Sequence, residues 1–188
     1  MRFQTSNFKL NEMVALGVMI RQPSGIFAKY DGPYKNWNEV IAASKEKPGS
    51  IDIAITGANT PDEASVDYLR TKGVDLLNVP FTKPADRYVS VLGGHVQLLY
   101  EQAGDIKGFL ETKKLRPLLF FANKRLPPPF ADVPVSAEFG YDVLLPQTRS
   151  IMAKKGIDRK ALDTLSNSLV KLSATPEFQN FLKEQYAL

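Results

Sequence analysis

The sequence contains no cysteine and only one histidine, His95. The absence of cysteine excludes disulfides, thiolate metal ligands and thiol catalysis. One histidine leaves too few ligands for a transition-metal site, so we expect no metal. No run of about 18 apolar residues could span a membrane as a helix. The opening residues, RFQTSNFKLNE, lack the apolar core of a signal peptide. We therefore expect either a cytoplasmic protein or a secreted one whose start has been removed.

Recognised catalytic motifs are also missing. The chain has no G-x-S-x-G, H-E-x-x-H, P-loop or G-x-G-x-x-G motif. Two acidic pairs, Asp62 with Glu63 and Glu101 with Asp105, could serve as acid and base. Carboxylates at helix starts more often compensate the helix dipole. We therefore expect no catalytic residues, no cofactor and no enzymatic activity.

The composition is that of an ordinary globular protein. The 188 residues are 44% hydrophobic and 23% charged, enough for one domain or two small lobes with a packed core. The net charge is +4, and basic residues cluster between Glu111 and Arg125, where an apolar strand interrupts them. This pattern favours a solvated rim over a nucleic-acid surface.

Apolar runs alternate with helical patterns along most of the chain. Short helices between strands indicate right-handed crossovers and a mainly parallel sheet. In such sheets, ligands bind beyond the carboxyl ends of the strands. Predicted strands cover residues 13–20, 24–30, 51–56, 74–80, 95–100, 115–122 and 149–156; predicted helices begin near residues 36, 60, 83, 103, 158 and 175.

The segment IAITGANTPDEAS, residues 53–65, combines a strand, a glycine turn and a helix start. Its Thr-Pro-Asp-Glu pattern is typical of a capping box, with Thr60 accepting from the Glu63 amide and Glu63 reaching back to the Thr60 amide. The amides of Gly57, Ala58 and Asn59, with the Thr56 hydroxyl and the Asn59 side chain, would remain to hold a carboxylate. A plain helix start is the alternative interpretation.

Three segments resemble one family in order and spacing. Residues 79–100, VPFTKPADRYVSVLGGHVQLLY, resemble Val-Pro-Tyr-Lys-Gly followed by a short helix and Leu-Gly-Gly-x-Val-Asp. Residues 113–142 resemble Gly-Lys-Leu-Arg-x-Leu-Ala-Val, Lys-Arg, Pro-Asp-Val-Pro-Thr and Glu-x-Gly. Residues 36–57 resemble a helix ending in Pro-Gly, then a strand and a glycine turn. Together they resemble the solute-binding proteins of tripartite tricarboxylate transporters, the TctC or Bug family.

The resemblance implies an α/β fold of the type II periplasmic-binding class that captures small carboxylates between two lobes. It also implies a periplasmic location and delivery of the ligand to membrane permease subunits, with no nucleic acid as partner. Family members carry a further N-terminal segment, so we expect a truncated version. Residues 1–28 would be a remnant of lobe one, residues 29–140 lobe two, and residues 141–188 the return to lobe one.

The family pattern also implies which residues face the ligand. The Lys-Gly of the family becomes Thr82-Lys83 here, and the Pro-x-Gly-x-Pro before the penultimate helix becomes AKKGID. Because Asp62 and Glu63 disfavour an anion at their helix start, an amino-acid-like ligand is an alternative to a di- or tricarboxylate. The predicted ligand-binding residues are Thr56, Gly57, Ala58, Asn59, Thr60, Pro80, Phe81, Thr82, Lys83, Glu101 and Gln102.

Two alternatives to a transport receptor remain. A degenerate interaction or sensor module would keep the fold without a transport role. Lobe-one strands missing from the sheet would leave an unpaired edge, which favours self-association. An enzyme on a similar scaffold is the weakest alternative, since no nucleophile and base are paired in the sequence.

Overall fold

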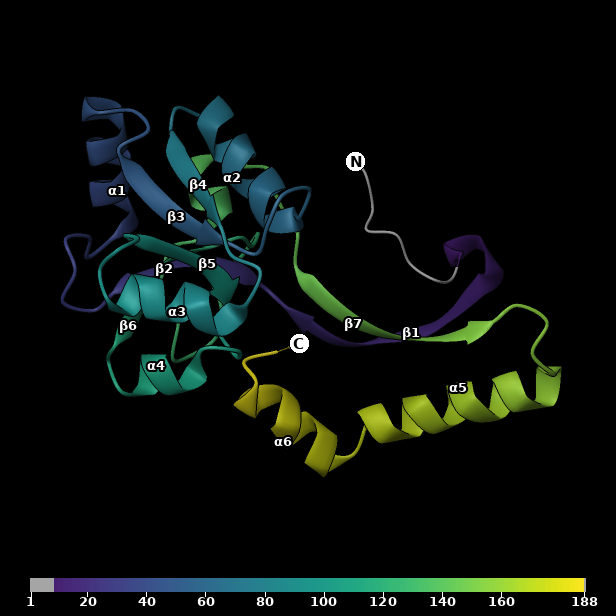
Figure 1. The fold of residues 1–188 in the computed structure, drawn as a ribbon. Helices are drawn as coiled ribbons and strands as arrows, with labels where there is room; N and C mark the ends of the chain where they lie inside the picture. The colour runs from purple at the N-terminus through teal and green to yellow at the C-terminus, as the bar shows by residue number, and fades with distance from the viewer. Residues whose placement is uncertain (1–8, 188) are drawn as a thin grey trace. The chain divides into compact units, whose positions relative to one another are not determined.

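The computed structural model describes residues 9–187, which form two compact units (Figure 1). One unit combines residues 9–22 with residues 147–187, and the other is continuous from Pro23 to Pro146. The boundaries expected after residues 28 and 140 both fall inside the continuous unit. Residues 24–28 belong there because they form a strand of its sheet.

The continuous unit is built on a five-stranded sheet of order β4-β3-β5-β2-β6. Strand β3 is parallel to β4 and β5, whereas β2 is antiparallel to both of its neighbours, β5 and β6. Strands β3 to β6 therefore point one way and β2 points the other way, so the sheet is mixed and predominantly unidirectional. The strands are β2 (Ser24–Lys29), β3 (Ile51–Ile55), β4 (Leu76–Pro80), β5 (Leu98–Gln102) and β6 (Leu115–Phe120).

Helices cover both faces of this sheet. Side chains of α1 (Trp37–Glu46) and α2 (Pro61–Thr71) share one buried cluster with Leu98 and Tyr100 of β5. Alternation along β5 places Glu101 on the opposite face, where it contacts α3 (Pro84–Leu92). The short helix α4 (Lys107–Glu111) packs against β6, and a 3₁₀ turn covers Ser136–Phe139.

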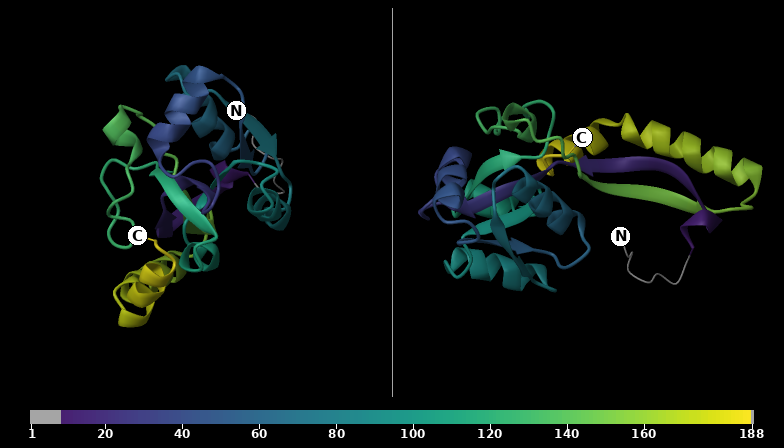
Figure 2. Two further views of the ribbon diagram at one scale, coloured as in Figure 1. Left: turned by 90° about the vertical axis from the view of Figure 1, so that its left-hand side faces the viewer. Right: turned by 90° about the horizontal axis from the view of Figure 1, so that it is seen from above.

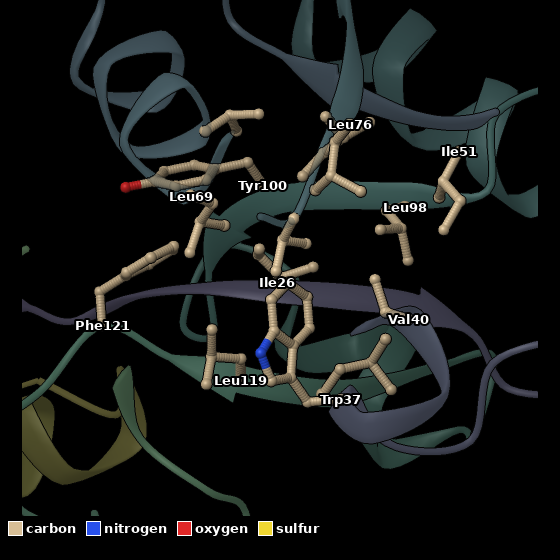
Figure 3. Close-up of a cluster of buried hydrophobic side chains, with 14 of the residues drawn as sticks. Ile26, Trp37, Val40, Ile51, Leu69, Leu76, Leu98, Tyr100, Leu119 and Phe121 are labelled. Carbon is tan, nitrogen blue, oxygen red and sulfur yellow. The ribbon is translucent and has the colours of Figure 1, made fainter. Parts of the chain in front are cut away.

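The core on the α1–α2 face is apolar and large (Figure 3). Trp37 of α1 and Leu69 of α2 point toward the sheet, where they meet side chains such as Ile26. All three are fully buried. Burying a side chain of this size contributes about 1.5–3 kcal/mol relative to leaving it exposed. This core holds the strand ends in place.

The other unit is smaller and contains a two-stranded antiparallel sheet, β1 (Met13–Gln22) with β7 (Gln147–Lys154). It also contains a 3₁₀ turn at Leu10–Glu12 and the helices α5 (Arg159–Ser173) and α6 (Pro176–Glu184). Figure 2 shows α5 running beside the β1–β7 ribbon, which it contacts through β1. Within residues 9–187, no helix has the length and apolar character needed to cross a membrane.

Four of the six helix starts predicted from the sequence are confirmed by side-chain caps; α3 starts at Pro84 without one, and α4 starts at Lys107, later than expected. Asn36, Thr60, Asp158 and Thr175 each accept a hydrogen bond from the amide three residues ahead. Such caps satisfy amides that have no partner inside the helix. Local sequence is sufficient here because cap and amide lie in the same turn.

Candidate functional site

The carboxyl ends of β3, β4 and β5 lie side by side at one edge of the sheet. Ile55 of β3 is in register with Pro80 of β4, and the Phe81 amide donates to the Ile55 carbonyl at 2.9 Å. On the other side, Ala54 is in register with Leu99 of β5. The structure therefore brings the three predicted segments, 56–60, 80–83 and 101–102, to the same edge.

The first segment is a turn that ends in the α2 cap. The Thr60 hydroxyl accepts from the Glu63 amide at 3.4 Å and donates to the Gly57 carbonyl at 2.7 Å. The predicted return bond is different: the Glu63 carboxylate accepts from the Asn59 amide at 2.5 Å, not from Thr60. Asn59 is left-handed (φ 60°), a conformation that asparagine tolerates better than most residues. This bend brings the Asn59 amide to the carboxylate.

The donors left in this turn are fewer than predicted. Asp62 accepts the Thr56 amide at 2.9 Å and the Thr56 hydroxyl at 2.5 Å, and Glu63 takes the Asn59 amide. The expectation that the Thr56 hydroxyl and the Asn59 amide are available is therefore wrong. The amides of Gly57 and Ala58 donate to no other residue within 9–187. Adjacent backbone donors without a protein partner are groups that can bind an anionic oxygen.

The acidic residues at the start of α2 do not face the turn as free charges. The Asp62 side chain is buried, and it accepts both Thr56 donors. It also lies 3.5 Å from the guanidinium of Arg87. Because Asp62 has a cationic partner, its repulsion of an anion at the turn is reduced.

Arg87 of α3 is the site residue that the sequence reasoning missed. Its side chain is 6% exposed, and its Nη1 donates to the Thr56 hydroxyl at 2.7 Å and the Tyr100 carbonyl at 3.4 Å. Its Nη2 forms a close ion pair with Glu101. A signal was present: Arg87 lies four residues before Val91, which is fully buried, so a charge sits on the apolar stripe of the helix.

Glu101 and Gln102 lie inside the unit, not on its surface. The Glu101 side chain is 5% exposed and accepts from the Tyr88 hydroxyl at 2.7 Å. Burial raises the pKa of Glu101, and the positive charge of Arg87 acts against that shift. Burial and the nearby Glu101 charge likewise raise the pKa of Tyr88. Gln102 donates through its side chain to the Ser24 hydroxyl at 3.1 Å.

The segment after β4 is the exposed part of the site. Pro80, Thr82 and Lys83 are exposed, and Phe81 is half-buried. Lys83 occupies the N-cap of α3 without a side-chain capping bond. Its ammonium group forms no ion pair with another residue of the described chain. The charge of Lys83 is therefore not neutralised by another side chain of the described residues.

Other polar features lie away from this edge. His95 is exposed after the end of α3, and no group of three or more possible metal ligands occurs among residues 9–187. A hollow of about 410 Å³ is found beside the starts of the parallel strands, at the opposite edge. It is lined by Lys29, Asp31, Leu92, Lys113 and Lys114.

The chain matches the model of a known protein family over nearly its whole length. The family described as "Tripartite tricarboxylate transporter family receptor", TctC, matches residues 2–186. Among curated proteins, a UPF0065 protein from Cupriavidus necator is 27% identical over 159 residues, 84% of this chain and 48% of its own length. A UPF0065 protein from Pseudomonas sp. (strain P51) is 24% identical over 167 residues, which are 86% of this chain and 49% of its own length. The chain thus spans about half the length of the curated relatives it matches.

Solved structures share the fold. "R. palustris Rpa4515 with adipate" has a TM-score of 0.85 at 20% identity, covering 98% of this chain and 62% of its own. "MatC (Rpa3494) from Rhodopseudomonas palustris with bound malate" has a TM-score of 0.75 at 20% identity, covering 94% and 60%. "Structure of periplasmic binding protein BugD" has a TM-score of 0.76 at 25% identity, covering 93% and 59%. The fold is therefore the type II periplasmic-binding fold predicted from the sequence.

Proposed function

Because the chain belongs to the tripartite tricarboxylate transporter receptor family, whose members are solute-binding proteins and not enzymes, we propose that it captures a small organic acid. The ligand class is a di- or tricarboxylate. The location is the periplasm, where the protein hands its ligand to membrane permease subunits of the transporter. Residues 23–146 act as the ligand-binding lobe in this proposal.

The observation that carries the proposal is the pair of free amides at Gly57 and Ala58. These donors replace the water that an isolated carboxylate holds, and their directions are set by the surrounding hydrogen bonds. Lys83, on the neighbouring loop, adds a positive charge at the same edge. Two solved structures of the same fold, Rpa4515 and MatC, contain adipate and malate, and both compounds are dicarboxylates.

Calorimetry against adipate, malate, citrate and a set of amino acids tests this proposal. We expect heat from at least one dicarboxylate and a matching thermal shift, because a ligand that binds only the native state raises the free energy of unfolding. Absence of heat and of thermal shift for every compound would contradict the proposal.

A glycine pair makes the test specific to the turn. Gly57 (φ 152°) and Gly73 (φ 83°) both adopt angles that side chains rarely take, and a Cβ would find open space at both. Alanine at either position therefore introduces backbone strain without a clash. We expect Gly57→Ala to weaken binding about tenfold or more, since it redirects an amide that contacts the ligand. Gly73→Ala, at the far end of α2, should retain the wild-type dissociation constant.

The smaller unit supports a second candidate, an interaction module. In the described chain, β1 and β7 pair only with each other, so each strand has an unpaired edge. Val18, Ile151 and Met152 on these strands are 59%, 44% and 38% exposed. Unpaired edges with apolar side chains favour association with another strand. Light scattering after size-exclusion chromatography distinguishes the candidates: a monomer that binds a dicarboxylate contradicts the interaction module.

A further inference from the structure

We propose that Arg87 is a positioning residue of the ligand site, acting through Thr56 and Asp62 on the turn at residues 56–60. Arg87 does not contact the ligand in this proposal. It fixes the direction of the Gly57 and Ala58 amides and offsets part of the negative charge of Asp62. The inference rests on the proposed function for the identity of the site. Its effect on the turn itself can be measured without any ligand.

The Nη1 side of the guanidinium holds the turn. Nη1 donates to the Thr56 hydroxyl at 2.7 Å, and that hydroxyl donates to Asp62 at 2.5 Å. The same Asp62 oxygen accepts the Thr56 amide at 2.9 Å. Thr56 is therefore bonded through both its backbone and its side chain immediately before Gly57. Loss of the Nη1 contacts would free the residue from which the turn departs.

The Nη2 side anchors the guanidinium to the sheet. Nη2 is ion-paired with Glu101 at the end of β5, and Glu101 is further held by the Tyr88 hydroxyl and the Gln102 amide. A guanidinium presents its donors in a rigid planar fork. Because Glu101 fixes one side of that fork, the other side has a defined position relative to Thr56. Arg87 thus couples the ends of β3 and β5 and the start of α2.

Stability alone is a weak explanation for this arrangement. Buried ion pairs often contribute no more to stability than apolar side chains of similar volume. The Nε of Arg87 is buried and has no hydrogen-bond partner within residues 9–187, which is costly for a buried donor. Arg87 is therefore poorly suited to a purely structural role. Its contacts are directed at the turn that supplies the two free amides.

The charge of Arg87 also acts on the repulsion that the acidic residues at the start of α2 exert on an anionic ligand. Asp62 shares its oxygen with the Thr56 amide and hydroxyl, one residue away from Gly57. Without a cation, this buried carboxylate would repel an anion at the turn. Arg87, 3.5 Å away, offsets part of this repulsion. The same guanidinium also pairs with Glu101, so one cation serves two carboxylates. The same residue thus orients the donors and lowers the repulsion of a negatively charged ligand.

The experiment compares Arg87→Lys and Thr56→Val with Arg70→Lys in the full chain. A lysine keeps the charge but loses the fork, so it cannot serve Thr56 and Glu101 together. Thr56→Val removes the bridging hydroxyl and leaves the Arg87–Glu101 pair intact. Arg70, on α2, is bonded to Asp67 and Asp75 and matches Arg87 in residue type. Two quantities are measured: amide exchange at residues 56–59 without ligand, and the dissociation constants for adipate and malate.

We expect Arg87→Lys and Thr56→Val to speed exchange at the residue 56 amide about tenfold. We expect the same two variants to weaken dicarboxylate binding by about the same factor. Arg70→Lys should change neither quantity. Wild-type exchange at residues 56–59 in both variants, or unchanged dissociation constants, would overturn the inference. A wild-type protein that binds no compound of the calorimetry panel contradicts the proposed function instead, and the exchange measurement then decides the role of Arg87 alone.

Discussion

At the scale of single residues, the site combines one exposed cation with a buried set of charges. Lys83 is exposed at the start of α3, whereas Arg87, Asp62 and Glu101 are buried behind the turn. Exposed charges act through a screened field, and buried charges act at short range in a less polarisable medium. The two groups therefore have different signatures in solution.

Lys83→Gln should weaken dicarboxylate binding about three- to tenfold at low ionic strength, because a positive charge near the ligand is lost. The difference from wild type should shrink as salt is added, since the interaction is exposed to solvent. Isothermal titration at two salt concentrations measures both effects. Lys47→Gln, at the opposite edge of the sheet before β3, is the matched control. An equal loss in both variants would assign the effect to net charge alone.

We expect the difference in the free energy of unfolding between wild type and Glu101→Gln to depend on pH. Burial raises its folded pKa above the ordinary value of 4.5, so the native state binds the proton more tightly than the unfolded state. The free energy of unfolding of the wild type therefore falls as pH rises from the ordinary pKa through the folded pKa. Glu101→Gln lacks this loss, so its stability relative to wild type should increase over that window. Urea unfolding at several pH values measures it.

Glu138→Gln is the control of opposite sign. Hydrogen bonding to Arg125 lowers the pKa of Glu138, so its contribution to stability is present above the ordinary pKa and is lost as pH falls through the folded pKa. The stability of Glu138→Gln relative to wild type should therefore decrease as pH rises. Parallel pH profiles for the two variants would contradict the assignment of Glu101.

At the scale of elements, the strand-turn-helix unit from β3 through α2 determines the site. The Thr60 hydroxyl caps α2 and also donates to the Gly57 carbonyl. One side chain thus links the first turn of the helix to the turn that carries the free amides. The stability of α2 and the geometry of the donors are coupled by that contact.

Thr60→Ala should lower the free energy of unfolding by about 1 kcal/mol, the usual effect of removing a helix cap. Thr60→Ser keeps the hydroxyl and should remain near wild type. Chemical denaturation of the two variants checks this prediction. An equal loss in both would show that the Thr60 methyl group, not the hydroxyl, stabilises the start of α2.

At the scale of the whole molecule, the two units differ in the size of their buried core. Of the buried hydrophobic side chains in the described chain, only Ala153 and Leu182 belong to residues 9–22 and 147–187. The five-stranded sheet, by contrast, buries large side chains such as Trp37 and Phe120 completely. Local opening is easier where few apolar contacts must be broken.

Amide exchange should therefore be at least about tenfold faster in β1, β7 and α5 than in β3 and β5. Mass spectrometry of exchanged peptides measures the difference directly. Leu119→Ala, in the core of the larger unit, should speed exchange in β3 and β5 while leaving the β1–β7 rates nearly unchanged. Equal protection throughout the wild-type chain would contradict this expectation.

Local sequence by itself determined the features that depend on neighbours in the chain. The caps at Asn36 and Thr60, the strand before Gly57 and the order of the elements all follow from propensity, capping chemistry and apolar pattern. The family was also identifiable, because its motifs lie in one order along the chain. These features need no knowledge of which distant segments meet.

Tertiary structure alone decided which groups meet across the sheet. Arg87 contacts Thr56 and Glu101 only because β3 and β5 are neighbours and α3 packs on one face. That contact occupies the Thr56 hydroxyl, which the sequence left free, and Arg87 also offsets part of the charge of Asp62. The antiparallel position of β2 between β5 and β6 could not be predicted from the sequence either. Strand pairing and side-chain partners depend on long-range packing, which no local pattern encodes.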